Sequence, residues 1–229
     1  MRDAVDAVFL DLFGTLLDLR PLAKACDRLA PGRGVEIAAR WRARQLEASW
    51  LRTAMERWAD FDVVTRDALA ATLDELGVDR PSDLDAAANA FLDLPLADGA
   101  AAAVRALKDA GVSVGVLTNA SRRTLASVAA RLDLDLDPLL SVDQAGRFKP
   151  HPTVYQLAVD ATGLEPGRIG FVTTNGWDAA GAGVVGFRVA WLRPDVGARL
   201  PSVGAPEPVI VTWTDVAGTF VVRLDAAQR

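Results

Sequence analysis

The sequence predicts an α/β protein in which a parallel β-sheet core carries an inserted, all-helical segment. After residue 98, apolar runs alternate with helical stretches of about ten residues, a pattern typical of βαβ units and a parallel sheet. Between the first apolar run and residue 95, every periodic stretch has helical spacing. We therefore expect a Rossmann-like core made of residues 1–17 and 96–229, and a helical cap made of residues 18–95.

The first strand and the insert come first along the chain. An apolar strand is expected over about residues 5–11 and ends at Asp11. A long helix is expected over residues 35–58, and further helices over 65–76 and 82–92, with breaks at Gly77 and Pro81. The long helix carries an apolar stripe made of Ile37, Trp41, Leu51, Met55 and Trp58.

The remaining elements alternate in type. Helices are expected over residues 99–111, ending at Gly111, over 121–132, over 151–163, ending at Gly163, over 177–186, and near the end of the chain. Strands are expected over residues 112–119, 139–146, 169–175, 187–192 and 208–213. Because ligands of such folds bind beyond the carboxyl ends of the strands, the residues after each strand are the candidates for a site.

The composition is that of an ordinary globular protein. The chain has 229 residues, 51% of them hydrophobic, and a net charge of −5. Basic residues do not cluster beyond pairs such as Arg122–Arg123, so nucleic acid is not an expected partner. No apolar stretch approaches the roughly 18 residues of a membrane span, and acids stand where a signal peptide is apolar. A single cysteine, Cys26, excludes an internal disulfide, and we expect a soluble cytoplasmic protein.

Polar residues at the strand ends form a candidate site. Asp11 is the natural nucleophile, because a carboxylate can form a covalent ester that is hydrolysed later. Thr15 is expected to orient it, and Lys149 to neutralise the charge of Asp11 and Asp178. Taken singly, these residues are equally well a capping acid, a turn residue and a surface lysine. Their occurrence together at successive strand ends favours the site.

Four segments of the chain resemble the four motifs of the haloacid dehalogenase superfamily, in the same order. The segments are "DLFGT" at 11–15, "LTNAS" at 117–121, "KP" at 149–150 and "TTNGWD" at 173–178. Within the superfamily, the chain is most similar to the L-2-haloacid dehalogenases (type II). That similarity rests on "WRARQLEASWLRT" at 41–53, "FKPHPTVY" at 148–155 and "FVTTNGWDAAGA" at 171–182.

Two positions separate this chain from the phosphatases of the superfamily. Phosphatases carry a second aspartate two residues after the nucleophile, which protonates a leaving alkoxide, and this chain has Phe13 there. They also carry an acid in the fourth motif that holds Mg²⁺, and the matching position here is Thr174. A departing halide needs no proton, so both differences favour carbon–halogen chemistry. No metal and no other cofactor is expected.

The resemblance implies a hydrolytic dehalogenase that acts on 2-haloalkanoic acids such as haloacetate and L-2-halopropionate. Asp11 would displace halide from C2 with inversion, and water would then free the 2-hydroxy acid from the aspartyl ester. The catalytic residues implied are Asp11, Thr15, Arg42, Lys149, Asn175 and Asp178. The substrate-binding residues implied are Leu12, Phe13, Leu46, Phe61, Thr118, Asn119, Tyr155, Thr173 and Trp177.

Two positions have competing interpretations. On a helical wheel Arg42 falls with Val35, Leu46 and Trp50, where a buried arginine needs an anion, either a bound halide or an ordinary carboxylate partner. The only histidine, His151, stands at a helix start, where capping is a stronger interpretation than base catalysis.

Three functions remain open at this point: a metal-independent dehalogenase, a phosphatase or phosphonate hydrolase of the same superfamily, and a non-catalytic ligand-binding relative. The partners expected are a small haloacid and a halide ion, with a homodimer suggested by the two apolar sides of the cap helix.

Overall fold

The strands of the protein form one parallel sheet. In the computed structural model, which describes residues 4–192 and 199–221, the sheet has six strands in the order β3-β2-β1-β4-β5-β6. They are β1 (Ala7–Leu10), β2 (Ser113–Thr118), β3 (Leu139–Ser141), β4 (Ile169–Thr173), β5 (Arg188–Trp191) and β6 (Val209–Ile210). Each neighbouring pair runs parallel, so the predicted α/β fold with a parallel sheet is confirmed.

Strand β1 lies at the centre of this sheet. Leu10 pairs with Val116 of β2 on one side and with Val172 of β4 on the other. Val8, Phe9 and Leu10 are fully buried, as expected for a central strand covered on both faces. The strand order turns back on itself between β1 and β4, and the residue that follows β1 therefore lies at a topological switch point.

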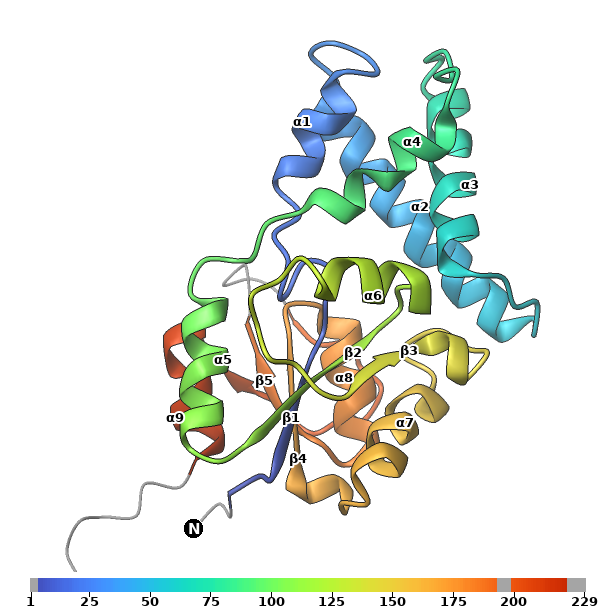
Figure 1. Ribbon diagram of the computed structural model, residues 1–229. Coiled ribbons are helices and arrows are strands. Elements are labelled where there is room, and N and C mark those ends of the chain that lie inside the picture. Colours follow the sequence, from blue (N-terminus) through green and yellow to red (C-terminus); the bar gives the residue numbers. More distant parts are fainter. Residues whose placement is uncertain (1–3, 193–198, 222–229) are drawn as a thin grey trace, which may run out of the picture.

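Helices cover both faces of the sheet (Figure 1). Helices α5 (Ala100–Asp109) and α9 (Val216–Phe220) pack on one face, and α7 (Pro152–Thr162) and α8 (Gly176–Val185) on the other. The other elements of the core are α6 (Arg122–Ala129) and the 3₁₀ turns η2 (Val142–Gln144), η3 (Pro166–Arg168) and η4 (Trp213–Asp215). Gly111 and Gly163 take the positive φ angles of 80° and 67° that end a helix, as predicted.

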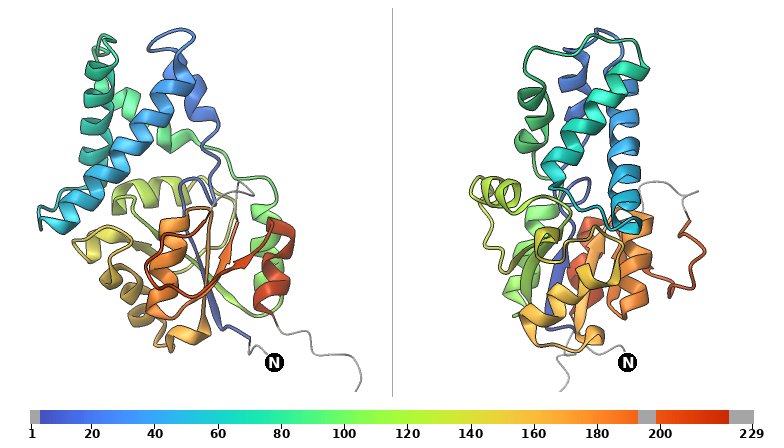
Figure 2. Two further views of the ribbon diagram at one scale, coloured as in Figure 1. Left: turned by 180° about the vertical axis from the view of Figure 1, so that it is seen from behind. Right: turned by 90° about the vertical axis from the view of Figure 1, so that its right-hand side faces the viewer.

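The insert forms a separate helical layer above the carboxyl ends of the strands (Figures 1 and 2). We call it the cap, and it contains α1 (Pro21–Asp27), α2 (Gly34–Ala54), α3 (Phe61–Glu75), α4 (Leu84–Ala88) and η1 (Asn89–Asp93). The chain leaves and re-enters the core side by side, because Leu17 and Leu96 form an antiparallel bridge. The N–H of Asp18 donates to the carbonyl of Pro95 at 2.9 Å, which ties the two connections together.

The buried face of α2 differs from the predicted stripe. Ile37 and Trp41 are buried as expected, but Leu51 and Met55 are 50% and 60% exposed, so the prediction was wrong for the end of the helix. The helix stops at Ala54. The buried positions after Trp41 are Gln45 and Ser49, one helical turn apart, which continue the same face towards the core.

Aromatic rings connect the cap to the loop that follows β1. The indole N–H of Trp41 donates to the carbonyl of Thr65 on α3 at 2.8 Å. The Trp41 ring meets the ring of Phe91 edge to face at 5.0 Å, and Phe91 meets Phe13 in the same manner at 5.1 Å. Contacts of this kind add to the free energy of burial, and here they join α2, η1 and the strand-end loop.

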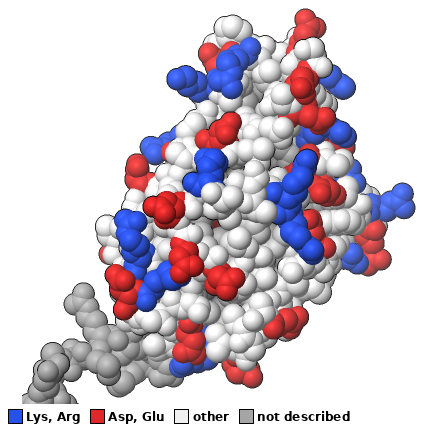
Figure 3. Space-filling view, viewed as in Figure 1, with Lys and Arg blue, Asp and Glu red and all other residues white. Residues whose placement is uncertain are grey.

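Charged side chains of both signs are interspersed over the face of the molecule shown in Figure 3. Among the described helices, none has the length and hydrophobicity of a membrane span. The expected final helix corresponds to α9, and residues 222–229 of the predicted core lie outside the described residues.

A glycine at the start of α2 permits the close approach of α1. A Cβ atom at Gly34 would lie 2.1 Å from the carbonyl oxygen of Ala23 and 2.7 Å from the backbone nitrogen of Asp27. We expect Gly34→Ala to lower the free energy of unfolding by about 1–3 kcal/mol, because backbone atoms cannot move aside as a side chain can. Thermal or urea unfolding measures this. Gly218→Ala, where no atom lies within 4 Å, is the matched control, and equal effects of the two variants would contradict the expectation.

Candidate active site

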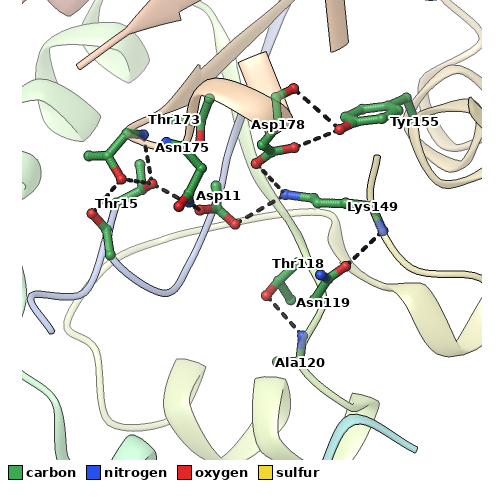
Figure 4. A network of polar contacts seen from close by, with 12 residues as sticks. Asp11, Thr15, Thr118, Asn119, Ala120, Lys149, Tyr155, Thr173, Asn175 and Asp178 are labelled. Atoms are coloured by element: carbon green, nitrogen blue, oxygen red, sulfur yellow. Dashed lines mark hydrogen bonds and ion pairs between the residues drawn. The ribbon is translucent and has the colours of Figure 1, made fainter. Parts of the chain in front are cut away.

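Asp11 is the first residue after β1, at the carboxyl edge of the sheet. Its N–H donates to the carbonyl of Val172 at 3.0 Å, which extends the ladder with β4 by one residue and fixes the backbone. The side chain is 8% exposed. The carboxylate therefore faces the space between core and cap, near the ends of β2 and β4 (Figure 4).

Both oxygens of the Asp11 carboxylate accept hydrogen bonds. Oδ2 accepts from Thr15 Oγ1 and from Asn175 Nδ2, each at 2.9 Å. Oδ1 accepts from Lys149 Nζ at 3.1 Å. The predicted roles of Thr15 and Lys149 next to Asp11 agree with this geometry. Oδ2 carries two donors and Oδ1 one, so Oδ1 is the oxygen with the freer lone pair.

Lys149 lies fully buried between two carboxylates. Its Nζ is 3.1 Å from Asp11 Oδ1 and 3.0 Å from Asp178 Oδ2, and it lies 4.8 Å from the centre of the Phe171 ring. The backbone N–H of Lys149 donates to Asn119 Oδ1 at 2.9 Å. An ammonium can be buried at this position because opposite charges and an aromatic face surround it.

Asp178 is completely buried in the first turn of α8. Burial raises the pKa of Asp178 to about 6, against the opposing effect of Lys149 and with a further rise from Asp11. Tyr155 donates its hydroxyl to Asp178 Oδ1 at 2.7 Å, which favours the carboxylate form. Tyr155, which the resemblance implies for substrate binding, is therefore linked to Lys149 through Asp178.

Hydrogen-bond donors without an acceptor in the described structure lie just after the ends of β1 and β2. Thr118 Oγ1 accepts from the N–H of Ala120 at 3.1 Å, and both Thr118 and Asn119 are buried. Among the described residues, the amide nitrogen of Asn119 and the backbone N–H groups of Leu12, Phe13 and Asn119 have no hydrogen-bond acceptor. Buried N–H groups without protein acceptors are suited to bind an anion.

The fourth motif is held by its own threonines. Thr173 Oγ1 accepts from the N–H of Asn175 at 3.1 Å, and this bond fixes the start of α8. Thr174 Oγ1 donates to the carbonyl of Gly14 at 2.8 Å, and its N–H donates to Thr15 Oγ1 at 3.0 Å. The strand-end loops of β1 and β4 are therefore joined directly.

The donor set does not fit Mg²⁺. Thr174 stands at the position of a metal-binding acid and uses its hydroxyl on a backbone carbonyl, while Lys149 Nζ already occupies the space between Asp11 and Asp178. Mg²⁺ prefers several carboxylate and water oxygens in octahedral geometry, and an ammonium beside them repels it. We derive no step through a metal ion.

Arg42 reaches the site from the cap helix α2. Burial lowers the pKa of its guanidinium, and the carboxylates of Asp11 and Asp178 act in the opposite direction. Its Nη1 donates to Gln45 Oε1 at 2.6 Å, and Gln45 Nε2 donates to Thr65 Oγ1 at 2.6 Å. In the described part of the chain, no carboxylate lies within ion-pair distance of Arg42. A neutral amide partner leaves its positive charge available to an anion.

The predicted apolar residues come from both layers. Leu12 and Phe13 are buried after β1, and Phe61 is buried at the start of α3, where its ring lies 5.6 Å from Phe148. Trp177 is half-buried beside Asp178, and its ring meets that of Trp50 at 5.7 Å. Leu46 lies half-buried on α2, one turn after Arg42. On the same predicted side of α2, Val35 is 75% exposed, so that part of the interpretation was wrong.

An apolar cavity of about 1110 Å³ lies beside these residues. Trp50, Phe148 and Trp177 contribute to its wall, together with His151. His151 caps α7, since its Nδ1 accepts from the N–H of Thr153, which supports the capping interpretation. The residues that line the cavity do not include Asp11, Lys149 or Asp178, so it is separate from the polar network.

Two residues of this region were missed in the sequence. Gln45 positions Arg42, and Phe91 lies between Phe13 and Trp41. A signal for Gln45 exists, because a polar residue one turn after Trp41 falls on the buried stripe and needs partners. Phe91 has no such signal, since its position depends on how η1 returns towards the core.

The fold and the site define a class of hydrolase. The chain matches the model of the haloacid dehalogenase-like hydrolases over residues 5–186, and it belongs to this family. The first, second and fourth motifs follow β1, β2 and β4, and the third precedes α7 and places Lys149 beside Asp11.

Within the family, the chain is similar to enzymes of one kind. It is 35% identical to an (S)-2-haloacid dehalogenase of Pseudomonas putida, over 96% of this chain and 99% of the relative. It is 34% identical to a haloacetate dehalogenase of a Moraxella strain, over 82% and 86%. A solved structure of the L-2-haloacid dehalogenase of Xanthobacter autotrophicus with covalently bound chloropropionic acid superposes with a TM-score of 0.86 at 34% identity, covering 93% of this chain and 97% of that one.

The hydrogen bond from Tyr155 to Asp178 can be tested by titration. We expect Tyr155→Phe to raise the pKa of Asp178 by about one further pH unit, because the carboxylate loses a buried donor while the ring stays in place. NMR of the labelled side-chain carboxyl carbon measures the midpoint. The substitution removes a hydroxyl that, among the described residues, hydrogen-bonds only to Asp178. Thr162→Val is the control, because it removes a hydroxyl of the same helix that bonds the carbonyl of Ala158 and not Asp178. An unchanged or lower midpoint in Tyr155→Phe would argue against this assignment.

Proposed function

We propose that this chain is a hydrolase that cleaves the carbon–halogen bond of 2-haloalkanoic acids, such as haloacetate and L-2-halopropionate, and forms a 2-hydroxy acid. One observation carries the proposal. Asp11 has the hydrogen-bonded, buried setting of a nucleophile, while the residue two positions later, Phe13, cannot supply a proton to a leaving group. This site is therefore suited to a reaction in which the leaving group departs as a stable anion.

In the first step, Oδ1 of Asp11 forms a bond to C2 of the substrate as the carbon–halogen bond breaks. The halide leaves with the bonding electron pair, and C2 inverts because attack and departure are in line. Arg42 and the free amide nitrogen of Asn119 supply positive charge and a donor for the departing ion. Charge that develops on the halide is thus met by groups fixed before the reaction.

The substrate carboxylate needs its own donors. Thr118 at the end of β2 and the backbone N–H groups of Leu12, Phe13 and Asn119 converge at the strand ends without protein acceptors in the described structure. We assign these groups to the carboxylate, since several N–H donors bind an anion without a full countercharge. Leu46, Phe61 and Trp177 are assigned to the apolar wall around C2 and its substituent.

In the second step, water attacks Cγ of the Asp11 ester. Thr15 and Asn175 already donate to Oδ2, the oxygen that becomes the ester carbonyl, and these donors stabilise the oxyanion that forms there. Asp178 takes the proton of the attacking water, and its raised pKa makes it a better base than an ordinary carboxylate. Collapse of the intermediate breaks the bond between Cγ and Oδ1, the proton held by Asp178 passes to the leaving oxygen, and the 2-hydroxy acid is released. Lys149 orients both carboxylates, and Tyr155 and Thr173 hold Asp178 and Asn175.

The alternative functions fit the site less well. A phosphatase needs an acid for the alkoxide and oxygen ligands for Mg²⁺, and Phe13 and Thr174 provide neither. A ligand-binding relative without turnover would not need Lys149, Asp178 and Asn175 arranged around one carboxylate.

We further propose that residues 1–17 and 96–229 form the core domain and 18–95 the cap, because the chain crosses between the layers at the Leu17–Leu96 bridge. We also propose a cytoplasmic enzyme that forms a homodimer through exposed apolar side chains at the end of α2 and just beyond it. Leu51 and Met55 support this, since an isolated subunit leaves them in water.

Halide release tests the proposed function. We expect the wild-type chain to release chloride from chloroacetate and L-2-chloropropionate at the same rate with and without EDTA. Asp11→Asn is expected to lower kcat by about 10⁴-fold or more, because the amide is not a nucleophile. Asp98→Asn, at a fully exposed carboxylate, is the matched control. If no haloacid releases halide, or if EDTA abolishes the release, the proposal is wrong.

A further inference from the structure

A second polar cluster joins the cap to the core outside the network around Asp11. We define the Asp62 cluster as Asp62, Ser121, Arg123 and Thr124. Asp62 Oδ2 accepts from Ser121 Oγ at 2.8 Å and from Arg123 Nη2 at 2.9 Å, and Oδ1 accepts from Thr124 Oγ1 at 2.8 Å. Asp62 belongs to the cap helix α3, whereas its three partners stand at the start of α6 in the core.

The geometry of both helix ends holds this cluster in place. Asp60 caps α3 by accepting from the N–H of Asp62 at 2.7 Å, and Ser121 caps α6 by accepting from the N–H of Thr124 at 3.0 Å. The Asp62 side chain is only 25% exposed. Its charge also lies at the N-terminus of α6, where the helix dipole favours an anion.

The Asp62 cluster lies next to residues that contact the lysine segment from two sides. Phe61 precedes Asp62, and its ring packs on Phe148, the residue before Lys149. Asn119 stands two residues before Ser121, and its side chain accepts from the N–H of Lys149. A movement of α3 away from α6 would therefore displace Phe61 from Phe148, the residue before Lys149.

We propose that Asp62 is a positioning residue that holds the cap closed over Asp11 and so sets the apparent affinity for substrate. This role rests on the proposed function for its kinetic consequence but on the Asp62 cluster for its structural basis. A ligand that binds only the closed form has an apparent affinity reduced by the fraction of molecules that are closed. Loss of Asp62 is therefore expected to raise KM, while complexes that have closed react at the normal kcat.

The test compares three variants of the full chain. Asp62→Ala removes the three hydrogen bonds, and Asp62→Asn retains an acceptor oxygen for a hydroxyl but loses the charge opposite Arg123. Asp67→Ala is the matched control on the same helix, because Asp67 is half exposed and its carboxylate pairs with the adjacent Arg66. We expect Asp62→Ala to raise KM for chloroacetate by about tenfold, with kcat within about threefold of wild type. The KM of Asp62→Asn is expected to lie between that of wild type and that of Asp62→Ala.

Hydrogen–deuterium exchange tests the same role without an activity assay. In Asp62→Ala, amides at the starts of α3 and α6 are expected to exchange about tenfold faster, while amides of β1 and β4 stay as in wild type. Should the wild-type chain release no halide, the proposed function fails and the exchange experiment still tests the closure of the cap. If Asp62→Ala does not fold, Asp62→Asn is measured in the same way. We then expect a rise of about threefold in the exchange rates of the amides at the starts of α3 and α6.

The proposal is overturned if Asp62→Ala, or Asp62→Asn in its place, matches Asp67→Ala in KM and in exchange. It is also overturned if the variant loses stability and kcat while KM remains that of wild type, since Asp62 would then serve folding alone.

Discussion

The buried ammonium of Lys149, placed between Asp11 and Asp178, is the interaction on which the rest of the site depends. Two carboxylates that share a site without a cation repel each other, and leaving a buried ion without its partner costs about 3–5 kcal/mol. Lys149 Nζ lies 3.1 Å from one carboxylate and 3.0 Å from the other. Its presence lets the two carboxylates, the proposed nucleophile and the proposed base, stand side by side without a metal ion, which would need the same position.

The parallel sheet and the cap each contribute residues to the site around Asp11. Strand ends bring Asp11, Thr118 and Asn175 to one edge because all six described strands point the same way. The cap brings Arg42, whose only side-chain hydrogen bond in the described structure is to the neutral Gln45. In the proposed mechanism, the core holds the groups that form and hydrolyse the ester, and the cap brings the positive charge for the departing ion. A reaction between the two layers requires that they stay together.

Much of the core could be predicted from the sequence because it depends on local patterns. Apolar runs that end in polar residues marked Asp11 and the fourth motif, and Lys149 and Asp178 were joined to them through the resemblance to the third and fourth motifs. The cap was harder. The exposure of Leu51 depends on where α2 ends, and the role of Gln45 depends on Thr65 of another helix. Contacts between residues far apart in the chain leave no periodic signal, so the hydrogen bonds between cap and core appear only in the structure.

In the proposed mechanism, Asp11 becomes covalently attached to the substrate, and water then attacks the carboxyl carbon of Asp11. A single turnover in ¹⁸O-labelled water, with enzyme in excess over chloroacetate, followed by mass spectrometry of the peptide that contains Asp11, tests it directly. We expect ¹⁸O to enter the Asp11 carboxylate and the first glycolate formed to carry unlabelled oxygen from Asp11. Label found in the glycolate alone, with none in Asp11, would contradict it and indicate direct attack of water on C2.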